Sequence, residues 1–255
     1  MKNVFEDYAN YYNLLYKDKN YKQETQYILD LLKRVSINEV KTILELGSGT
    51  GRHAILMGHQ GLRVTGVERS QEMLKIAQLS LPQTLKDKVQ FIQGDATSFE
   101  DKNLYDACLS LFHVVSYQIS NNDVSRIMTT ASKHLKTNGF FIFDIWYGPA
   151  VLWIRPETRI QKFIDGDRSL TRLASSELLD HENVVDVHYT LYFEEKNING
   201  ISKVNEMHKM RYFFLLELKQ FLANSGLCFV HAEEWLTGNK PSQDTWGVTI
   251  VAKKV

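Results

Sequence analysis

The segment from Thr42 to Ala54 (TILELGSGTGRHA) most constrains the fold of this chain of 255 residues. An apolar run leads directly into three closely spaced glycines, Gly47, Gly49 and Gly51, and a helical pattern of apolar residues follows. Glycine suits such a turn because it adopts positive φ values and lets the backbone approach a ligand closely. A strand, a glycine turn and a helix in this order are typical of a nucleotide-binding turn in an open α/β sheet.

The residue at the end of this first strand discriminates between ligands. Glu45 stands two residues before the first glycine. A carboxylate at this point suits a ligand with cationic groups and repels a pyrophosphate. The pattern therefore favours S-adenosylmethionine (SAM), which carries an ammonium and a sulfonium group, over NAD, although an NAD-dependent dehydrogenase stays open as an alternative.

Two further apolar runs end in an acidic residue. Glu68 closes the run that starts at Leu62, and Asp95 follows the run that starts at Val89. Because the carboxyl ends of parallel strands meet at one edge of a sheet, we expect these acids to lie near Glu45. Glu68 is expected to accept hydrogen bonds from ribose hydroxyls, and Asp95 is expected to accept one from an adenine amino group. Ser70 is expected to cap the helix after the second strand.

The rest of the chain continues the α/β pattern and then departs from it. We expect strands over 105–112 and 140–146, with a helix over 122–134 between them. Alternating runs between 159 and 212, separated by turn residues, predict three or four antiparallel strands inserted after the fifth strand. A helix over 215–223 and strands over 226–236 and 246–253 then return to the sheet. We therefore expect a helical N-terminal lid (1–37), a ligand-binding core (38–150 and 214–255) and an inserted β platform (151–213).

Composition excludes several classes of protein. The 30 basic and 30 acidic residues balance, and no Lys/Arg run predicts a nucleic-acid surface. No apolar stretch approaches the ~20 residues that a membrane span needs, and the N-terminus lacks the apolar core of a secretion signal, so we expect a cytoplasmic protein. Cys108 and Cys228 both lie in apolar runs. They are expected to be buried hydrophobic residues rather than metal ligands, and no metal site is predicted.

Three motifs together resemble those of the class I SAM-dependent methyltransferases: Glu45-Leu-Gly-Ser-Gly-Thr-Gly, Gly66-Val-Glu-Arg-Ser and Gln93-Gly-Asp-Ala. The resemblance implies an α/β, Rossmann-like sheet of strand order 3-2-1-4-5-7-6 with strand 7 antiparallel, here carrying the inserted antiparallel β platform. It also implies that SAM is the cofactor. The residues expected to bind it are Glu45, Gly47, Ser48, Gly49, Arg52, Glu68, Arg69, Met73, Gly94, Asp95, Ala96 and Leu111.

A narrower resemblance covers nearly the whole chain. The segments Tyr11–Tyr16, Gly49–His53, Ile145–Pro149 and Val187–Tyr189 resemble those of bacterial N-methyltransferases that act on nucleotide-linked amino sugars, and more distantly those of glycine N-methyltransferases. That family inserts a platform at the same place and often dimerises through it, which implies a homodimer. This chain departs from the family in the segment His113–Tyr117 and in a C-terminal loop that elsewhere is rich in glycine and arginine.

Methyl transfer mainly requires that nucleophile, methyl group and sulfur be aligned and that water be excluded. An amine must be neutral to react, and a tyrosine oxygen or an imidazole is a sufficient proton acceptor. Each of the candidates could instead be a packing residue, and His113 could be a core histidine. The candidates for catalysis are Tyr16, Tyr117 and His113, and those for substrate binding are Tyr12, Tyr21, Asp144, Trp146 and Tyr147.

These observations predict transfer of a methyl group from SAM to a small molecule, in the first place the amine of a nucleotide-linked amino sugar or a related metabolite. Two alternatives stay open. One is an O-methyltransferase acting on another small metabolite, and the other is a SAM-binding protein without transferase activity.

Overall fold

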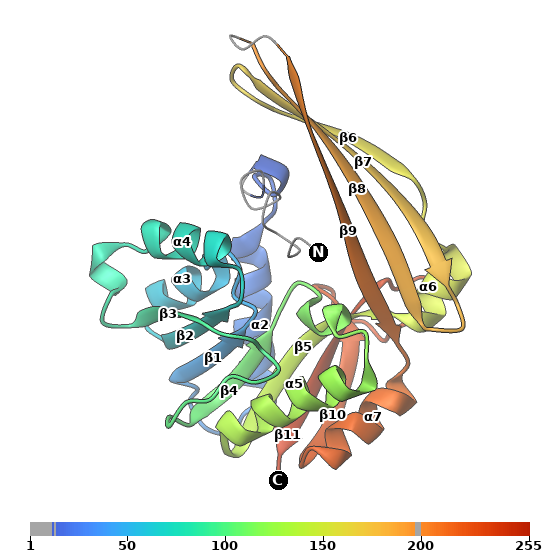
Figure 1. The fold of residues 1–255 in the computed structure, drawn as a ribbon. Coiled ribbons are helices and arrows are strands. Elements are labelled where there is room, and N and C mark those ends of the chain that lie inside the picture. The colour runs from blue at the N-terminus through green and yellow to red at the C-terminus, as the bar shows by residue number, and fades with distance from the viewer. Residues whose placement is uncertain (1–11, 13, 197–199) are drawn as a thin grey trace.

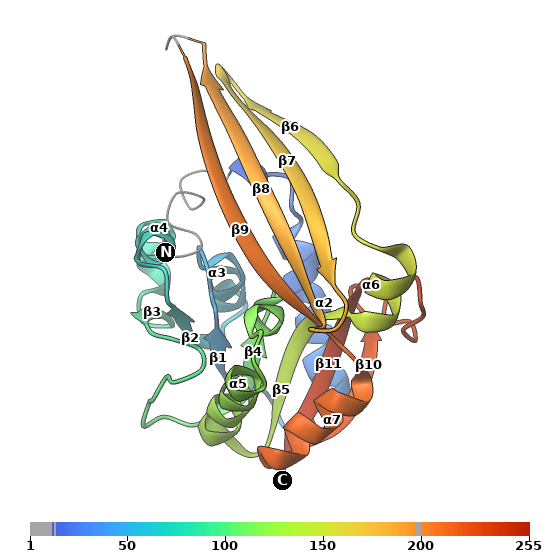
Figure 2. The ribbon, with the colours of Figure 1, turned by 45° about the vertical axis from the view of Figure 1, so that its right-hand side comes forward.

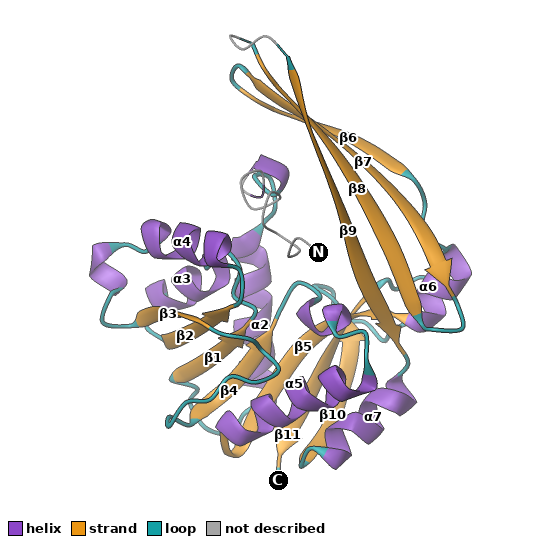
Figure 3. Ribbon diagram, in the orientation of Figure 1, coloured by secondary structure: helices purple, strands orange, loops and turns teal. Residues whose placement is uncertain are grey.

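The computed structural model describes Tyr12, residues 14–196 and residues 200–255. The first residues of the expected N-terminal lid, 1–11 and 13, lie outside the described residues. A mixed sheet with helices on both faces forms the body of the molecule, and four long strands extend away from it (Figure 1). Figure 3 shows that the helices gather around the body, whereas the projecting part consists almost entirely of strands.

The central sheet has the architecture that the motifs imply. Its parallel strands lie in the order β3-β2-β1-β4-β5, β11 pairs antiparallel with β5, and β10 pairs antiparallel with β11. The predicted α/β fold with an antiparallel last strand is therefore confirmed. The strands are β1 (Thr42–Leu46), β2 (Arg63–Glu68), β3 (Val89–Gln93), β4 (Tyr105–Ser110), β5 (Leu135–Tyr147), β10 (Leu227–Glu234) and β11 (Gly247–Lys254).

Alternation along the strands divides the core into two apolar layers. Ile43 of β1 packs with α2, α3 and α4, whereas its neighbour Leu44 packs with α5 and α7 on the opposite face. Ser70 caps α4 as predicted, because its side chain accepts a hydrogen bond from the Met73 amide. The helices are α2 (Tyr21–Val35), α3 (Arg52–His59), α4 (Gln71–Ser80), α5 (Asn121–His134) and α7 (Leu215–Asn224), with 3₁₀ turns η1 (Gln83–Leu85) and η2 (Val114–Tyr117).

The inserted strands form an antiparallel ribbon in the order β9-β8-β7-β6. Short helix α6 (Gly148–Ile154) leads from β5 into β6 (Arg159–Asp165), which is followed by β7 (Arg168–Leu179), β8 (Val184–Glu195) and β9 (Ile201–Phe213). Figure 2 shows this ribbon twisting as it projects from the body.

The strand order differs from the expected one at the junction of the two parts. Trp146 and Tyr147, at the end of β5, pair in parallel with Tyr212 and Phe213 of β9. The central sheet therefore continues into the ribbon rather than standing apart from it. This pairing fixes the base of the ribbon beside the carboxyl end of β5, where a ligand is expected to bind.

The two cysteines differ in their surroundings. Cys108 lies buried in β4 as predicted, but Cys228 is exposed. The prediction for Cys228 was wrong because β10 lies at the edge of the central sheet and leaves one side of that strand to solvent. Within the described part of the chain, no cluster of side chains could hold a metal ion, and no helix is long and apolar enough to cross a membrane.

Candidate functional site

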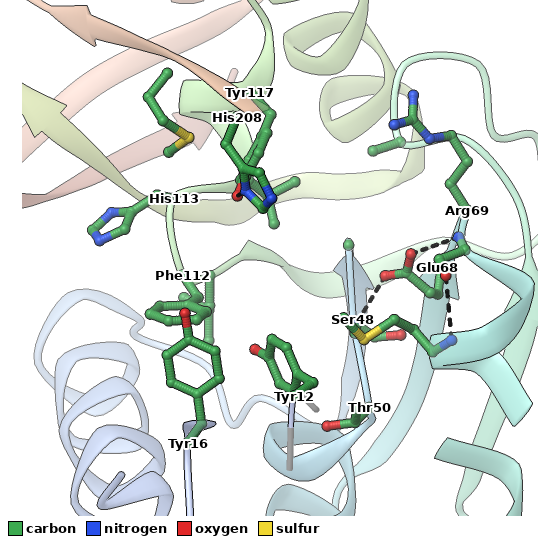
Figure 4. Close-up of a pocket in the computed structure, with 18 of the residues that line it drawn as sticks. Tyr12, Tyr16, Ser48, Thr50, Glu68, Arg69, Phe112, His113, Tyr117 and His208 are labelled. Carbon is green, nitrogen blue, oxygen red and sulfur yellow. Dashed lines mark hydrogen bonds between the residues drawn. The ribbon is translucent and has the colours of Figure 1, made fainter. Parts of the chain in front are cut away.

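A cavity of about 1040 Å³ lies at the carboxyl edge of the parallel strands, between the glycine turn, the segment before α2 and the ribbon. Figure 4 shows side chains converging on it from these three directions. This cavity is lined by most of the residues that were predicted from the sequence: Tyr12, Tyr16, Tyr21, Glu45, Gly47, Ser48, Gly49, Arg52, Glu68, Arg69, Met73, Gly94, Asp95, Ala96, Leu111, His113, Tyr117 and Trp146.

The glycine turn needs glycine for two different reasons. Gly47, Gly49 and Gly51 all have positive φ, at 77°, 55° and 76°. A Cβ atom at Gly51 would lie 2.4 Å from the Phe91 ring, whereas one at Gly49 would meet no protein atom within 4 Å. Gly51 is therefore required by packing, and Gly49 presents bare backbone to the cavity. The Gly47 amide donates a 2.8 Å hydrogen bond to the Val67 carbonyl, which holds the turn against β2.

Glu45 supplies a buried acidic group beneath the turn. Its residue is only 1% exposed, and among the described residues no group donates a hydrogen bond to its Oε2 atom. Burial, with a smaller contribution from the charge of Glu68, raises the pKa of Glu45 to about 8. A buried acceptor without a donor is costly, so this atom suits the ammonium group of a ligand. The Ser48 hydroxyl in the glycine turn is likewise buried without a hydrogen-bond partner among the described residues.

Glu68 is fixed in place by the backbone. Its Oε2 accepts a 2.8 Å hydrogen bond from the Gly49 amide, and its Oε1 accepts a 2.7 Å bond from the Ser70 amide. Burial raises the pKa of Glu68, although these backbone donors oppose the rise. A carboxylate accepts about four hydrogen bonds, so both oxygens keep capacity for the hydroxyls of a ribose. Figure 4 shows this carboxylate beside Ser48.

Asp95 lies at the end of the third strand. Its Oδ1 accepts hydrogen bonds of 2.8 Å from the Thr97 amide and 2.7 Å from the Thr97 hydroxyl. Its Oδ2 lies 3.8 Å from the Arg69 guanidinium. Burial acts to raise the pKa of Asp95, but the Thr97 donors together with the charges of Arg69 and Arg126 outweigh it and lower this pKa. The carboxylate is therefore ionised and has an oxygen available to accept from an amino group.

A strained turn after β4 forms part of the opposite wall. Phe112 and His113 both have positive φ, at 66° and 64°, which is uncommon for residues other than glycine. Asp144 of β5 holds this turn: its Oδ2 accepts a 3.0 Å hydrogen bond from the His113 amide and lies 2.6 Å from His113 Nδ1. Asp144 itself is 1% exposed and does not line the cavity, contrary to the expectation that it binds substrate. Asp144 reaches the cavity wall through its contacts with His113.

Tyr147 also departs from the expectation. Successive residues of a strand point to opposite sides, so Trp146 lines the cavity while Tyr147 packs against the apolar core. The Trp146 ring lies 5.3 Å from the ring of Trp246 in a T-shaped arrangement. The end of β5 therefore contributes one aromatic side chain to the cavity rather than two.

Aromatic rings close the side of the cavity nearest the N-terminus. The ring of Tyr16 lies 4.6 Å from that of Tyr12 and 5.1 Å from that of Phe112. The Lys19 ammonium lies 3.2 Å from the centre of the Phe112 ring. Burial raises the pKa of Tyr21 to about 12, so this tyrosine stays neutral. The segment before α2 thus packs directly on the strained turn (Figure 4).

Sequence reasoning missed the contribution of the ribbon. Glu206 and His208 of β9, Tyr189 of β8 and Arg172 of β7 all line the cavity. The Nδ1 atom of His208 lies 2.8 Å from the Tyr117 hydroxyl, and its Nε2 atom lies 2.9 Å from Glu206 Oε2. Alternation along the strand could have shown that Glu206 and His208 share one face. Only the pairing of β9 with β5 shows that this face meets the cavity.

Comparison with known proteins identifies the fold. Residues 43–139 match the methyltransferase domain family. This part of the chain is similar to a methyltransferase domain. The dTDP-3-amino-3,4,6-trideoxy-alpha-D-glucopyranose N,N-dimethyltransferase of Streptomyces venezuelae is 25% identical over 226 residues, which cover 87% of this chain and 90% of that relative.

Two solved structures show the same architecture along their whole length. The crystal structure of Streptomyces venezuelae DesVI has a TM-score of 0.81 at 20% identity and covers 98% of this chain and 99% of its own. SAM-bound CalS10, an amino pentose methyltransferase from Micromonospora echinaspora, has a TM-score of 0.77 at 20% identity and covers 100% and 99%. The inserted ribbon is therefore part of a fold that this chain shares with solved structures.

Proposed function

We propose that this methyltransferase transfers the methyl group of SAM to the amine of a nucleotide-linked amino sugar or a closely related small metabolite. The observation that carries the proposal is that one cavity joins two different ends. One end holds the acidic strand ends Glu45, Glu68 and Asp95, and the other is a wall of tyrosine and histidine side chains.

The acidic end fits SAM group by group. Glu45 Oε2 and the Ser48 hydroxyl are buried and have no hydrogen-bond partner among the described residues, and they would hold the ammonium end. Glu68 would hold the ribose, and Asp95 would hold the adenine amino group. Gly49 presents backbone without a side chain, so the ligand can approach the turn closely. SAM supplies an electrophilic methyl group when bound, and the residues of the chain have to orient the acceptor towards it and exclude water.

The opposite end suits an uncharged amine. Tyr16, His113 and Tyr117 place hydroxyl and imidazole groups in an otherwise aromatic wall. Such groups accept a hydrogen bond from an amine without stabilising its protonated form as a carboxylate would. Because Asp144 lies behind His113 and does not line the cavity, its charge does not contact the acceptor directly.

Two observations support an acceptor that carries a phosphate group. Arg159 and Arg172 of the ribbon line the cavity, and guanidinium groups bind phosphates well. The Streptomyces venezuelae relative is named for a dTDP-linked amino sugar. We therefore expect the nucleotide part of the acceptor to lie along the ribbon and the sugar amine to lie beside Tyr117.

The test is a set of matched acceptors. The purified protein is incubated with SAM and a panel of dTDP-linked amino sugars, and products are identified by mass spectrometry as gains of one or two methyl groups. The control acceptors carry a hydroxyl in place of the amine. Methylation of amine acceptors alone supports the proposal, whereas methylation of the hydroxyl acceptors alone, or of none although SAM binds, refutes it.

We also propose a homodimer formed through the ribbon. β6 is the outer strand, and Ile160 and Ile164 on it are 71% and 67% exposed. A long edge strand with exposed apolar side chains is prone to pair with a second copy. Light scattering should show that the wild-type protein is a dimer and that the double variant Ile160→Lys/Ile164→Lys is a monomer. The control variant Ile37→Lys, which changes a residue that is 99% exposed, should stay a dimer. A wild-type monomer would contradict this proposal.

A further inference from the structure

A line of three side chains runs from the cavity into the ribbon. The Tyr117 hydroxyl lies 2.8 Å from His208 Nδ1, and His208 Nε2 lies 2.9 Å from Glu206 Oε2. The side chain of His208 is 3% exposed and that of Glu206 is 11% exposed. Figure 4 shows Tyr117 and His208 together at the wall opposite Glu68. Neither His208 nor Glu206 has a role in holding the SAM end of the cavity.

The hydrogen bonds fix the direction of this line. Because a carboxylate oxygen is an acceptor, the 2.9 Å contact between His208 Nε2 and Glu206 Oε2 assigns the ring proton to Nε2. Nδ1 is then the bare nitrogen, and it accepts the proton of the Tyr117 hydroxyl. A phenol oxygen accepts hydrogen bonds as well as donating one, so Tyr117 Oη can receive a hydrogen bond from an acceptor amine.

We propose that His208, oriented by Glu206, draws a proton from the acceptor amine through Tyr117, which rests on the proposed function. The ammonium N–H bond breaks as its proton moves to Tyr117 Oη, and the Tyr117 O–H bond breaks as that proton moves to His208 Nδ1. The amine becomes a neutral nucleophile, and the imidazolium is paired with Glu206. After the product leaves, the reverse transfers return the proton to water in the cavity.

Tyr117 needs this partner because it cannot serve as a base alone. Burial raises its pKa well above the usual range, and nearby Tyr189, Tyr16 and Glu206 add to the rise. The hydroxyl therefore stays neutral and has to pass a proton on as it receives one. The groups that face His208 include Tyr117, Glu206 and the Tyr189 ring, whose centre lies 4.9 Å from that of the imidazole. Arg172 lies on the Tyr189 ring, 5.6 Å from its centre.

The kinetic test compares three variants over a pH series. His208→Gln keeps a polar side chain but removes the proton acceptor, so kcat should fall about 10²-fold or more near neutral pH, in the range of general base catalysis. The loss should shrink as pH rises and the amine deprotonates in solution, while the KM for SAM stays unchanged. Glu206→Gln should show a smaller loss of the same form. His188→Gln, at an exposed residue of the neighbouring strand β8, should match the wild type at every pH.

A loss in His208→Gln that is equal at every pH would show a structural role and overturn the proposal. Nitrogen NMR of ¹⁵N-labelled histidine gives a second readout that needs no acceptor. His208 should be protonated on Nε2 in the wild type, and Glu206→Gln should shift it to a mixture of tautomers. An unchanged tautomer in Glu206→Gln would also overturn the proposal. Failure of the wild type to methylate any amine refutes the proposed function instead, and the NMR result still decides the arrangement of His208.

Discussion

Glu45 offers the sharpest test of the cofactor site, because its environment makes SAM binding depend on pH. The carboxyl is buried beneath the glycine turn, and burial raises its pKa to about 8. The ammonium group of a ligand binds the ionised carboxylate. Below about pH 8 the empty site holds a proton that has to leave before the ion pair forms, so proton release and ligand binding are linked.

The size of the effect follows from this linkage. Each pH unit below the pKa costs 1.36 kcal/mol, so at about pH 6 ionising Glu45 costs about 3 kcal/mol, or about 100-fold in affinity. Affinity should therefore rise about tenfold per pH unit until it levels off near the pKa of Glu45. The imidazole of His53 faces the same carboxyl, with its Nδ1 atom 3.7 Å from Glu45 Oε1.

The measurement is calorimetric titration between about pH 5.5 and about pH 7.5, where Glu45 is mostly protonated in the empty site. S-adenosylhomocysteine is the better ligand, because it carries the same ammonium group and does not react. Glu45→Gln is the matched variant: it should bind more weakly at the upper end of this range, with an affinity that hardly changes with pH. Equal slopes in the wild type and in Glu45→Gln would show that Glu45 does not bind the ammonium.

The raised pKa of Glu45 makes the stability of the protein without ligand fall as pH rises, whereas the affinity for the ligand increases. The folded protein holds the Glu45 proton up to about pH 8, whereas the unfolded chain releases it near the ordinary value of 4.5. Stability is therefore fully present below the ordinary value and is lost as pH rises towards about 8, by at most about 5 kcal/mol. Without ligand, the free energy of unfolding of the wild type should fall relative to Glu45→Gln over this range. A constant difference between the two would contradict the buried, partly protonated state of Glu45.

Three further substitutions test other parts of the site. Asp95→Ala should weaken SAM binding by about 1–3 kcal/mol through loss of one hydrogen bond, and an unchanged dissociation constant would remove the adenine role. Tyr16→Phe should lower turnover with little effect on SAM affinity, and wild-type turnover with every accepted substrate would remove Tyr16 from catalysis. Gly51→Ala should destabilise the fold by about 1–3 kcal/mol, since its Cβ would meet the Phe91 ring. A melting temperature equal to that of the wild type would contradict this last expectation.

The SAM end of the cavity could be predicted because each of its parts is local. A glycine turn, the acid before it and the acid at the end of the next strand are each contained within a few residues. Parallel pairing of β1 with β2, and of β2 with β3, then brings Glu45, Glu68 and Asp95 to one edge. The sequence pattern thus specifies both the residues and their meeting place.

The acceptor end could be predicted only in part because its geometry is set by contacts distant in sequence. The positive φ values of Phe112 and His113 depend on Asp144, which lies on the next parallel strand. The segment 112–117 contains no glycine to signal this conformation, and positive φ is uncommon for Phe. Asp144 and Tyr147 do not line the cavity for a related reason. Position along β5 shows how near each residue is to the carboxyl end of the strand, but not which side of the strand faces the cavity.

The parallel pairing of β5 with β9 connects the ribbon to the chemistry of the site. It spans only Trp146 with Tyr212 and Tyr147 with Phe213, yet it places the end of β9 against η2, where Tyr117 lies. His208 is four residues before Tyr212 on the same strand and therefore shares its face of the ribbon. A ribbon that only bound the acceptor could shift along β5 without harm. A ribbon that also supplies His208 has to keep this register, so a substitution that weakens the junction should lower turnover before it lowers SAM affinity.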